Sequence, residues 1–214
     1  MIRWLFADQL GPHFLDDWDD RVLLIESRSV LRRRRFHRAK AHLVLSALRH
    51  RAAELGERAV LLQADTYGEA LAQVDEPVQV IHPTSRAALE FVRGRGVEVL
   101  PPRGFVTSGE EFAQWAGSKP LLERFYRRAR ARTGVLMEGG EPVGGRWNFD
   151  ADNREPPPPG PTRLGVADPW WPAEDEIDDR VREDLLGVEC VGDDGPRRFA
   201  VTRSEALAAL EVFL

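Results

Sequence analysis

Polar side chains follow two of the short apolar runs in this sequence. Asp8 and Gln9 come after the first run, and Glu26 and Ser27 come after the second. Carboxylates accept hydrogen bonds, and amides both donate and accept them, so such a set can hold a polar ring or a polyol chain. The alternative is that Asp8 and Glu26 only cap turns, as polar residues beyond a strand often do.

The strongest local concentration of charge is the arginine-rich run 32–40. Such a run can hold an anion or meet DNA phosphates, although for most of its members we favour a solvated entry into a helix. His37 and Lys40 are three residues apart and share a helical face, so they are the stronger candidates for ligand contacts. The histidines lack the carboxylate or cysteine company of a metal site, and we expect no metal.

Other chemical motifs are missing from the places where they would have to stand. No glycine-rich dinucleotide fingerprint, phosphate loop or serine elbow follows an apolar run. The single cysteine, Cys190, excludes an internal disulfide and a cysteine-rich zinc or iron–sulfur site built from this chain alone. The residues therefore indicate a binding domain without evident catalytic groups, and they do not identify its ligand.

Short apolar runs alternate with helical patterns between residues 2 and 100. Each run is nearly continuously apolar, as in strands that are buried on both faces of a parallel sheet. The expected strands are 2–7, 22–25, 59–62, 78–81 and 97–100. This rhythm of strand and helix predicts a doubly wound, Rossmann-like α/β fold, with a five-stranded parallel sheet flanked by helices.

The longest expected helix covers residues 34–55. One of its sides is apolar, and Arg38, Arg49 and Arg51 on the rest of its surface should be available to solvent. Shorter helical patterns cover 67–74 and 85–94.

The pattern changes beyond the sheet region. Ser108 resembles an N-cap followed by first-turn acids, so a helix should run from there to about residue 116. The pair Lys119-Pro120 opens another helix, which should end near Gly134.

A long segment rich in proline and glycine follows, over residues 138–172. It cannot sustain a helix or a central strand, so it is expected to be an extended linker, yet its tryptophans indicate that it lies against a surface. Beyond it, Thr202 should cap a final apolar helix, 206–214. That helix either docks on the sheet domain or begins a helical domain, and the pattern favours neither.

Composition limits the class of protein. The 214 residues carry a formal net charge of -5, whereas a dedicated nucleic-acid-binding module needs a basic surface to neutralise phosphates. No stretch approaches the about eighteen apolar residues of a membrane span, and the N-terminus lacks the pattern of a signal peptide. We therefore expect one globular domain with a tail, located in the cytoplasm, without membrane contact.

Several stretches of the chain carry a resemblance. Residues 119–128 read KPLLERFYRR, 133–137 read TGVLM and 142–154 read PVGGRWNFDADNR. Agreement extends to DQL at 8–10, SALRH at 46–50 and FAVTR at 199–203. Over essentially its entire length the chain resembles the deoxyribodipyrimidine photolyase-related family of bacterial iron–sulfur photolyases and cryptochromes.

The resemblance implies a light-driven flavoprotein. In that family an antenna chromophore, 6,7-dimethyl-8-ribityllumazine, sits in the N-terminal sheet domain and passes excitation energy to FAD in a C-terminal helical domain, near a four-cysteine [4Fe-4S] cluster. The implied segments are an antenna domain at 1–135, an interdomain linker at 136–200 and the first helix of the helical domain at 201–214. FAD and the cluster would belong to the rest of that helical domain, so this chain alone is not expected to repair DNA.

The resemblance also implies which residues contact the chromophore. Asp8 and Gln9 match the motif after the first strand, Glu26 matches the acid after the second, and His37 and Lys40 match the basic helix entry. The full candidate set is Ala7, Asp8, Gln9, Glu26, Ser27, Arg28, His37, Lys40 and Ala41. The sequence departs from the family pattern at Val30, where a glutamate is expected, at Phe36, where a histidine is expected, and at 82–86.

Three functions remain open at this point. The chain is the antenna part of a repair enzyme or blue-light receptor, with a separate helical FAD-binding subunit as partner and DNA met only through the complete protein. Alternatively, it is a stand-alone chromophore- or partner-binding protein that has lost catalysis. Fold analogy alone suggests a general nucleotide-binding protein. Exposed apolar residues in the linker and last helix would also favour self-association.

Overall fold

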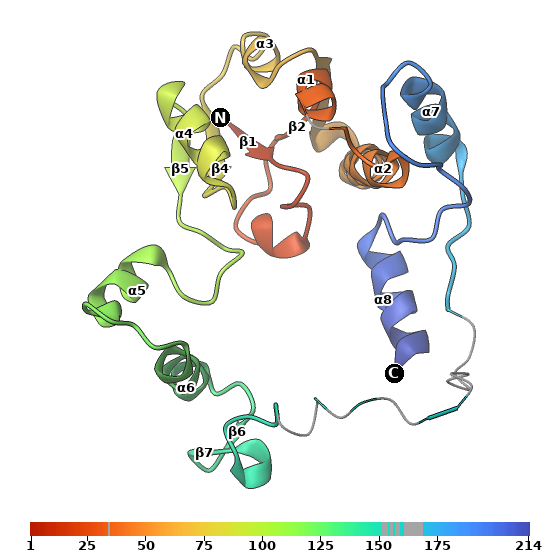
Figure 1. Cartoon of the computed structure of the whole chain (residues 1–214). Helices are drawn as coiled ribbons and strands as arrows, with labels where there is room; N and C mark the ends of the chain where they lie inside the picture. The colour runs from red at the N-terminus through yellow and green to blue at the C-terminus, as the bar shows by residue number, and fades with distance from the viewer. Residues whose placement is uncertain (34, 151–153, 155, 157–158, 161–168) are drawn as a thin grey trace. The chain divides into compact units, whose positions relative to one another are not determined.

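The structure is a computed structural model that describes residues 1–33, 35–150, 154, 156, 159–160 and 169–214 (Figure 1). The chain forms two compact units, Met1–Gly104 with Ala167–Leu214, and Phe105–Val166. These units follow packing, whereas the three segments 1–135, 136–200 and 201–214 were distinguished by expected role and remain a prediction.

The first unit is built on a five-stranded parallel sheet with the strand order β3-β2-β1-β4-β5. Its strands are β1 (Ile2–Leu5), β2 (Val22–Ser27), β3 (Ala59–Ala64), β4 (Val78–Ile81) and β5 (Glu98–Leu100). In the central strand, Trp4 is in register with Leu23 of β2 and Val80 of β4. The winding therefore reverses between β1 and β4, which confirms the predicted doubly wound fold.

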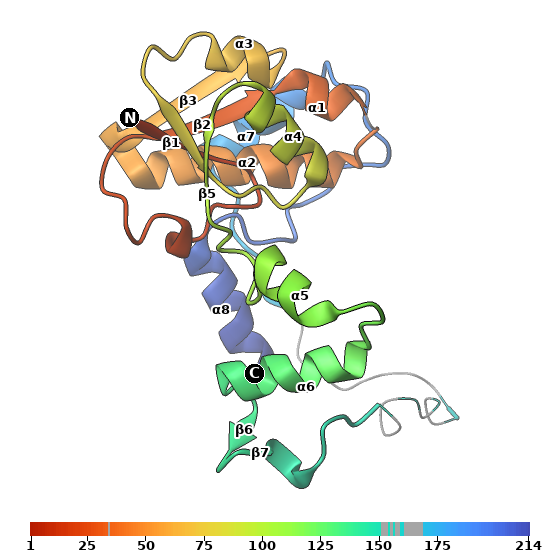
Figure 2. The same cartoon turned by 90° about the vertical axis from the view of Figure 1, so that its left-hand side faces the viewer.

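One face of the sheet is covered by α3 (Tyr67–Leu71) and α4 (Arg86–Gly94), as Figure 2 shows. Trp4 reaches this face and is fully buried; its ring centroid lies 4.2 Å from that of Phe6 and 5.1 Å from that of Tyr67. Burying a side chain such as Phe6 stabilises a fold by about 1.5–3 kcal/mol, so this aromatic cluster fixes α3 against the sheet.

The opposite face is covered by α2 (Arg38–Leu55) and by the 3-10 turn η1 (Pro12–Phe14). Arg3 points to this side and is buried, because its Nη1 donates to the Phe14 carbonyl oxygen at 3.1 Å and to Asp17 at 2.6 Å. The apolar side chains that meet here include Leu5, Phe14, Leu24, Leu48 and Ile81. The sheet is thus the middle of three layers.

Two helices, rather than the single predicted one, follow β2. α1 (Arg28–Arg33) continues directly from the strand, and α2 begins at Arg38. His37 ends the connection between them, because its backbone is extended and its Nδ1 accepts the amide N–H of Ala39 at 3.2 Å. The predicted helix start at residue 34 was therefore wrong; Arg34 itself lies outside the described residues.

A further helix, α7 (Glu176–Leu185), packs against α2 (Figure 1). Its side chains Val181 and Leu185 are fully buried against Leu45 of α2 and Leu31 of α1. No helix was predicted for this acidic segment, because the acids between its apolar residues dominate the composition. After α7, residue 191 pairs with His37 as an isolated parallel bridge.

The last helix, α8 (Arg203–Phe213), begins at the predicted cap. Thr202 accepts the N–H of Glu205, and the Glu205 side chain completes a capping box. None of the residues of α8, all of which the structure describes, is buried. Docking of this helix on the sheet, one of the two alternatives considered above, is therefore absent from the described part of the chain.

The second unit contains α5 (Gly109–Ala116), α6 (Leu122–Thr133), a hairpin of β6 (Met137–Glu138) and β7 (Glu141–Pro142), and the turn η3 (Val143–Gly145). Ser108 caps α5, and Gly134, with φ of 71°, ends α6, both as predicted. Arg130 of α6 is buried and donates to the Trp147 carbonyl oxygen at 3.1 Å. Much of the predicted linker 138–172 lies outside the described residues, but its start forms this hairpin.

Candidate functional site

Gln9 lies at the reversal of winding between β1 and β4, where ligands bind in folds of this kind. Its side chain is buried, and its Nε2 donates to the carbonyl oxygens of Ile81 and His82, both at 3.2 Å. Its Oε1 accepts the N–H of Phe6 at 3.5 Å. The amide of this predicted contact residue is thus used to tie the two strand ends together.

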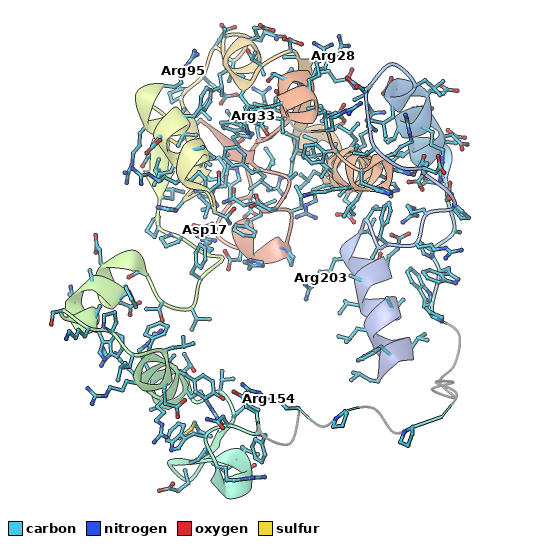
Figure 3. All side chains as sticks on the ribbon, viewed as in Figure 1. Asp17, Arg28, Arg33, Arg95, Arg154 and Arg203 are labelled. Carbon is cyan, nitrogen blue, oxygen red and sulfur yellow. The ribbon has the colours of Figure 1, made fainter. Side chains whose placement is uncertain are left out.

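Asp8 stays exposed beside Gln9, as does Ala7. The Thr84 hydroxyl donates a hydrogen bond to the Asp8 carboxylate. Burial raises the pKa of Tyr67, and the charge of Asp8 raises it further, while the charge of Arg33, labelled in Figure 3, opposes this. The point where the winding reverses therefore has the carboxylate of Asp8 at its surface and the protonated phenol of Tyr67 behind it.

Glu26 lies near the end of β2 and is buried. It accepts hydrogen bonds from Nε and Nη2 of Arg49, at 2.7 and 2.9 Å, and from Nε2 of Gln63 at 2.9 Å. These bonds from Glu26 hold the pKa of Arg49 above its ordinary value, although burial opposes the shift. The expectation that Arg49 is available to solvent was wrong, since only 12% of its side chain is exposed.

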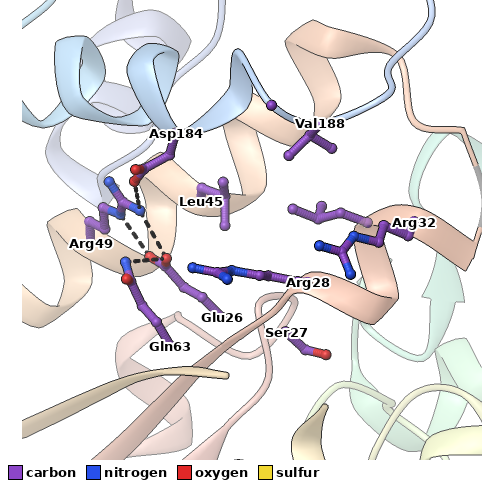
Figure 4. A pocket seen from close by; sticks show the side chains of 11 residues that line it. Glu26, Ser27, Arg28, Arg32, Leu45, Arg49, Gln63, Asp184 and Val188 are labelled. Atoms are coloured by element: carbon purple, nitrogen blue, oxygen red, sulfur yellow. Dashed lines mark hydrogen bonds and ion pairs between the residues drawn. The ribbon is translucent and has the colours of Figure 1, made fainter. Parts of the chain in front are cut away.

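A cavity of about 260 Å³ adjoins this network (Figure 4). Its lining comes from β2, α1, α2, β3 and the segment 184–188, and it includes Glu26, Ser27, Arg28, Leu31, Arg32, Leu45, Arg49, Gln63, Asp184, Gly187 and Val188. Leu31, Leu45 and Val188 give it an apolar side. The sequence therefore brings three of the predicted contact residues into one hollow.

Arg28 is the side chain in this cavity that is open to a ligand. Figure 4 shows it extended across the hollow toward Glu26. Within the described part of the chain, Arg28 makes no ion pair or hydrogen bond, so all its donors are available. Arg32, by contrast, pairs with Asp65 at 3.0 Å.

Ser27 contributes to the cavity wall, but its hydroxyl points away from Glu26 (Figure 4). That hydroxyl donates to the Asp65 carbonyl oxygen at 3.1 Å and lies 3.1 Å from Ser29 Oγ. Successive strand residues point to opposite faces, so Glu26 and Ser27 cannot both aim at one ligand.

The remaining predicted contacts lie at the start of α2 and do not line the cavity. His37 stands against Gly192, where an added Cβ would come within 2.3 Å of its Nε2. Lys40 is exposed, with its Nζ 5.1 Å from the centroid of the Phe36 ring. Ala41 is fully buried in the cluster that joins α2 to α7. The candidate set is thus divided among three places.

Sequence reasoning missed Gln63, Asp184 and Val188. Gln63 follows the third apolar run just as Glu26 follows the second, so the rule that found Glu26 would have found it too. Asp184 and Val188 had no such signal, because they reach the cavity only through the packing of α7 on α2.

One group within the described residues, His50, Asp175 and Asp178, brings three possible ligand atoms within 4.8 Å of one another. We assign no metal to it. Asp178 already accepts hydrogen bonds from His42 and Ser46. The guanidinium of Arg197 also lies next to this group, with its Nε 2.9 Å from Asp178 Oδ2, and it would repel a cation.

Helices of the described ranges are all too short or too polar to cross a membrane.

Comparisons with known sequences agree with the fold. The profile of the family described as deoxyribodipyrimidine photo-lyase-related protein matches residues 3–188. A (6-4) photolyase of Agrobacterium fabrum (strain C58) is 33% identical over 242 aligned positions, which cover 98% of this chain and 46% of that relative. The chain thus spans about half the length of the curated relative that it matches.

Proposed function

Because this chain belongs to the deoxyribodipyrimidine photolyase-related family, we propose that it is the antenna-bearing part of a light-driven DNA repair or blue-light-sensing protein. Its ligand in this proposal is an aromatic chromophore, 6,7-dimethyl-8-ribityllumazine. The observation that carries the proposal is the cavity beside β2, whose lining combines apolar side chains with the guanidinium of Arg28, which is unpaired within the described part of the chain.

The chemistry of the cavity suits a flat polar ring. Such a ring needs apolar side chains against its faces and a few placed donors and acceptors at its edge. Leu31, Leu45 and Val188 supply the first, and Arg28 supplies donors for carbonyl oxygens. Glu26 accepts hydrogen bonds from Arg49 and Gln63, so its role is to keep Arg49 in place beside the cavity. The hollow, at about 260 Å³, lies just below the range of about 300–1,000 Å³ that is usual for ligand sites.

The bound lumazine would absorb light and pass on its excitation energy. The protein's own part in this is to bind and orient the ring and to keep water from its faces, which needs no catalytic residue. Repair would in addition need FAD and a [4Fe-4S] cluster; the cluster takes four thiolates, and the sequence contains one cysteine. We therefore place electron transfer in a helical FAD-binding partner or domain, and we propose that contact with DNA is made through that partner or domain. We also propose that the protein lies in the cytoplasm.

The test is titration of the purified chain with 6,7-dimethyl-8-ribityllumazine, followed by absorption and fluorescence. We expect a shifted lumazine band. Arg28→Ala should weaken binding about tenfold, which corresponds to a loss of about 1.4 kcal/mol. The matched control is Arg86→Ala, since Arg86 lies on α4 outside the cavity with 90% of its side chain exposed. An unshifted spectrum from a chain with a native circular dichroism spectrum would remove the antenna proposal, and so would an Arg28→Ala variant that binds like the control.

A second function, partner binding without catalysis, is favoured by α8. Leu207, Leu210, Val212 and Phe213 are all at least half exposed, which is costly in water unless another surface covers them. Light scattering after size exclusion measures this directly. A chain that is dimeric at micromolar concentration, and monomeric with Leu210→Ser and Phe213→Ser, would support association through α8.

A further inference from the structure

The contact between α2 and α7 is charged as well as apolar. On the α2 side it contains two buried imidazoles, His42 and His50. On the other side it contains the carboxylates of Asp175, Asp178 and Asp194. Each imidazole meets an oxygen at both of its ring nitrogens, and this arrangement fixes how many protons it holds.

His42 lies between two carboxylates. Its Nε2 is 2.8 Å from Asp178 Oδ1, its Nδ1 is 3.2 Å from Asp194 Oδ1, and its side chain is fully buried. A neutral imidazole has one N–H and one lone pair, so one of these nitrogens would turn a lone pair toward a carboxylate. Both contacts are favourable only when His42 carries both protons.

Each of the two carboxylates around His42 lies against an arginine. Burial raises the pKa of Asp178, but hydrogen bonds from Ser46 and His42 and the charge of Arg197 outweigh it and hold that pKa below its ordinary value. The Nε of Arg197 lies 2.9 Å from Asp178 Oδ2, although not in hydrogen-bonding geometry. Asp194 is paired with Arg182 of α7 through its other oxygen. Neither of these two carboxylates is therefore expected to supply the missing proton.

His50 repeats the arrangement about two turns of helix further along α2. Its Nδ1 lies 2.8 Å from the Ser46 carbonyl oxygen, which can only accept, so Nδ1 carries a proton. Its Nε2 lies 3.0 Å from Asp175 Oδ2. Burial raises the pKa of Asp175, and bonds from Asp178 N–H and His50 more than reverse the effect, so this oxygen also needs a donor.

We propose that the segment 174–194 docks on α2 as a proton-coupled latch, in which His42 and His50 must both be doubly protonated. A solvent-exposed imidazole loses its second proton near pH 6.5, so the undocked chain holds fewer protons than the docked chain above that pH. Docking is then strongest at mildly acidic pH and weakens as pH rises. Each coupled proton changes the docking equilibrium by up to tenfold per pH unit.

The latch bears on the cavity, in a step that rests on the proposed function. Asp184, Gly187 and Val188 form one wall of the cavity, and they are present only when α7 is docked. A raised pH should therefore open that wall and weaken the hold on a bound ring. The latch would make chromophore retention depend on pH through groups that do not touch the chromophore.

The experiment is hydrogen exchange of α7 amides in the chain without chromophore, at pH 6 and pH 8, with EDTA present and intrinsic rates corrected. Protection of α7 should fall at least tenfold between the two, while β1 and β4 stay protected. Long-range ¹⁵N spectra should show the rings of His42 and His50 doubly protonated at pH 6 and losing a proton together with that protection. Equal protection of α7 at both pH values would overturn the proposal, as would neutral rings at pH 6.

Variants separate a proton latch from simple packing. Asp194→Asn supplies an amide that donates to a neutral His42 Nδ1, so docking should persist while the pH dependence falls by one proton. Asp193→Asn, at an exposed neighbour, should change neither. An unchanged pH slope in Asp194→Asn would refute the role of His42. Failure of lumazine to bind at any pH would remove the proposed function alone, because the latch is read from α7 without ligand.

Discussion

Removal of the Arg49 side chain should be among the most damaging single changes next to the cavity. Glu26 is 6% exposed, and two of its three hydrogen bonds come from Arg49. Arg49→Ala would leave the carboxylate with Gln63 alone, at a site largely closed to water. Removing one partner of a buried ion pair costs about 3–5 kcal/mol. Domains are stable by about 5–15 kcal/mol, so a large part of the folding free energy would be lost.

Urea unfolding followed by far-ultraviolet circular dichroism measures this loss. With a slope of about 2 kcal/mol per molar urea, the midpoint should fall by about 2 M. The control is Arg86→Ala, which breaks an exposed pair with Glu90 and should cost about 0.3–0.5 kcal/mol. Both variants remove an arginine from a helix, so the difference between them reports burial of the partner.

A second substitution tests the cause. Glu26→Gln in the Arg49→Ala background replaces the buried carboxylate by a neutral amide, so it should recover much of the lost stability. The reasoning would be refuted by an Arg49→Ala midpoint equal to that of Arg86→Ala. It would also be refuted by a double variant as unstable as Arg49→Ala alone, since the uncompensated carboxylate would then not be the cause.

Two further predictions concern backbone strain and acid stability. Gly192→Ala forces a Cβ onto His37 at φ of 70° and should lower the free energy of unfolding by about 1–3 kcal/mol, which faster proteolysis after α7 would report. The control is Gly195→Ala, at φ of 60° with nothing within 4 Å of the added Cβ, and it should cost less. Hydrogen bonds from Arg3 and Arg103 lower the pKa of Asp17 to about 2. The stabilisation of the fold by the ionised Asp17 is therefore present above the ordinary pKa of 3.8 and is lost as pH falls toward 2. Asp17→Asn should flatten this part of the curve of urea midpoint against pH, by a small amount at high salt, because half of the Asp17 side chain is exposed.

The sheet was predictable because its strands are buried on both faces. A run such as 22–25 has no polar position to confuse its period, and β2 begins at the same residue in the structure. Caps were equally predictable, since Ser108 and Thr202 act on backbone groups three residues away. α7 was not predictable in the same way, because its burial depends on α2, more than a hundred residues earlier, and its many acids conceal Val181 and Leu185.

The candidate site was predictable only to its edge. The rule that ligands meet the carboxyl ends of strands led to Glu26 and Ser27, and both line the cavity. The same rule could not show that the Gln9 amide is already hydrogen-bonded to backbone carbonyl oxygens, because this depends on how close β4 lies to β1 in the folded sheet. Nor could it show that Arg49 is buried. Which side of a helix is buried depends on the elements that pack on it, and α7 packs on α2 in addition to the sheet.

The central place of β1 in the sheet affects how the chain is made. β1 leaves the ribosome before β4, yet Gln9 binds a carbonyl oxygen 72 residues further on, at the end of β4. Until β4 emerges, the nascent chain exposes one edge of a strand that contains Ile2 and Trp4, and such an edge pairs readily with other chains. Chains truncated between β3 and β4 should therefore aggregate during synthesis, whereas truncation after β5 leaves both edges of β1 paired.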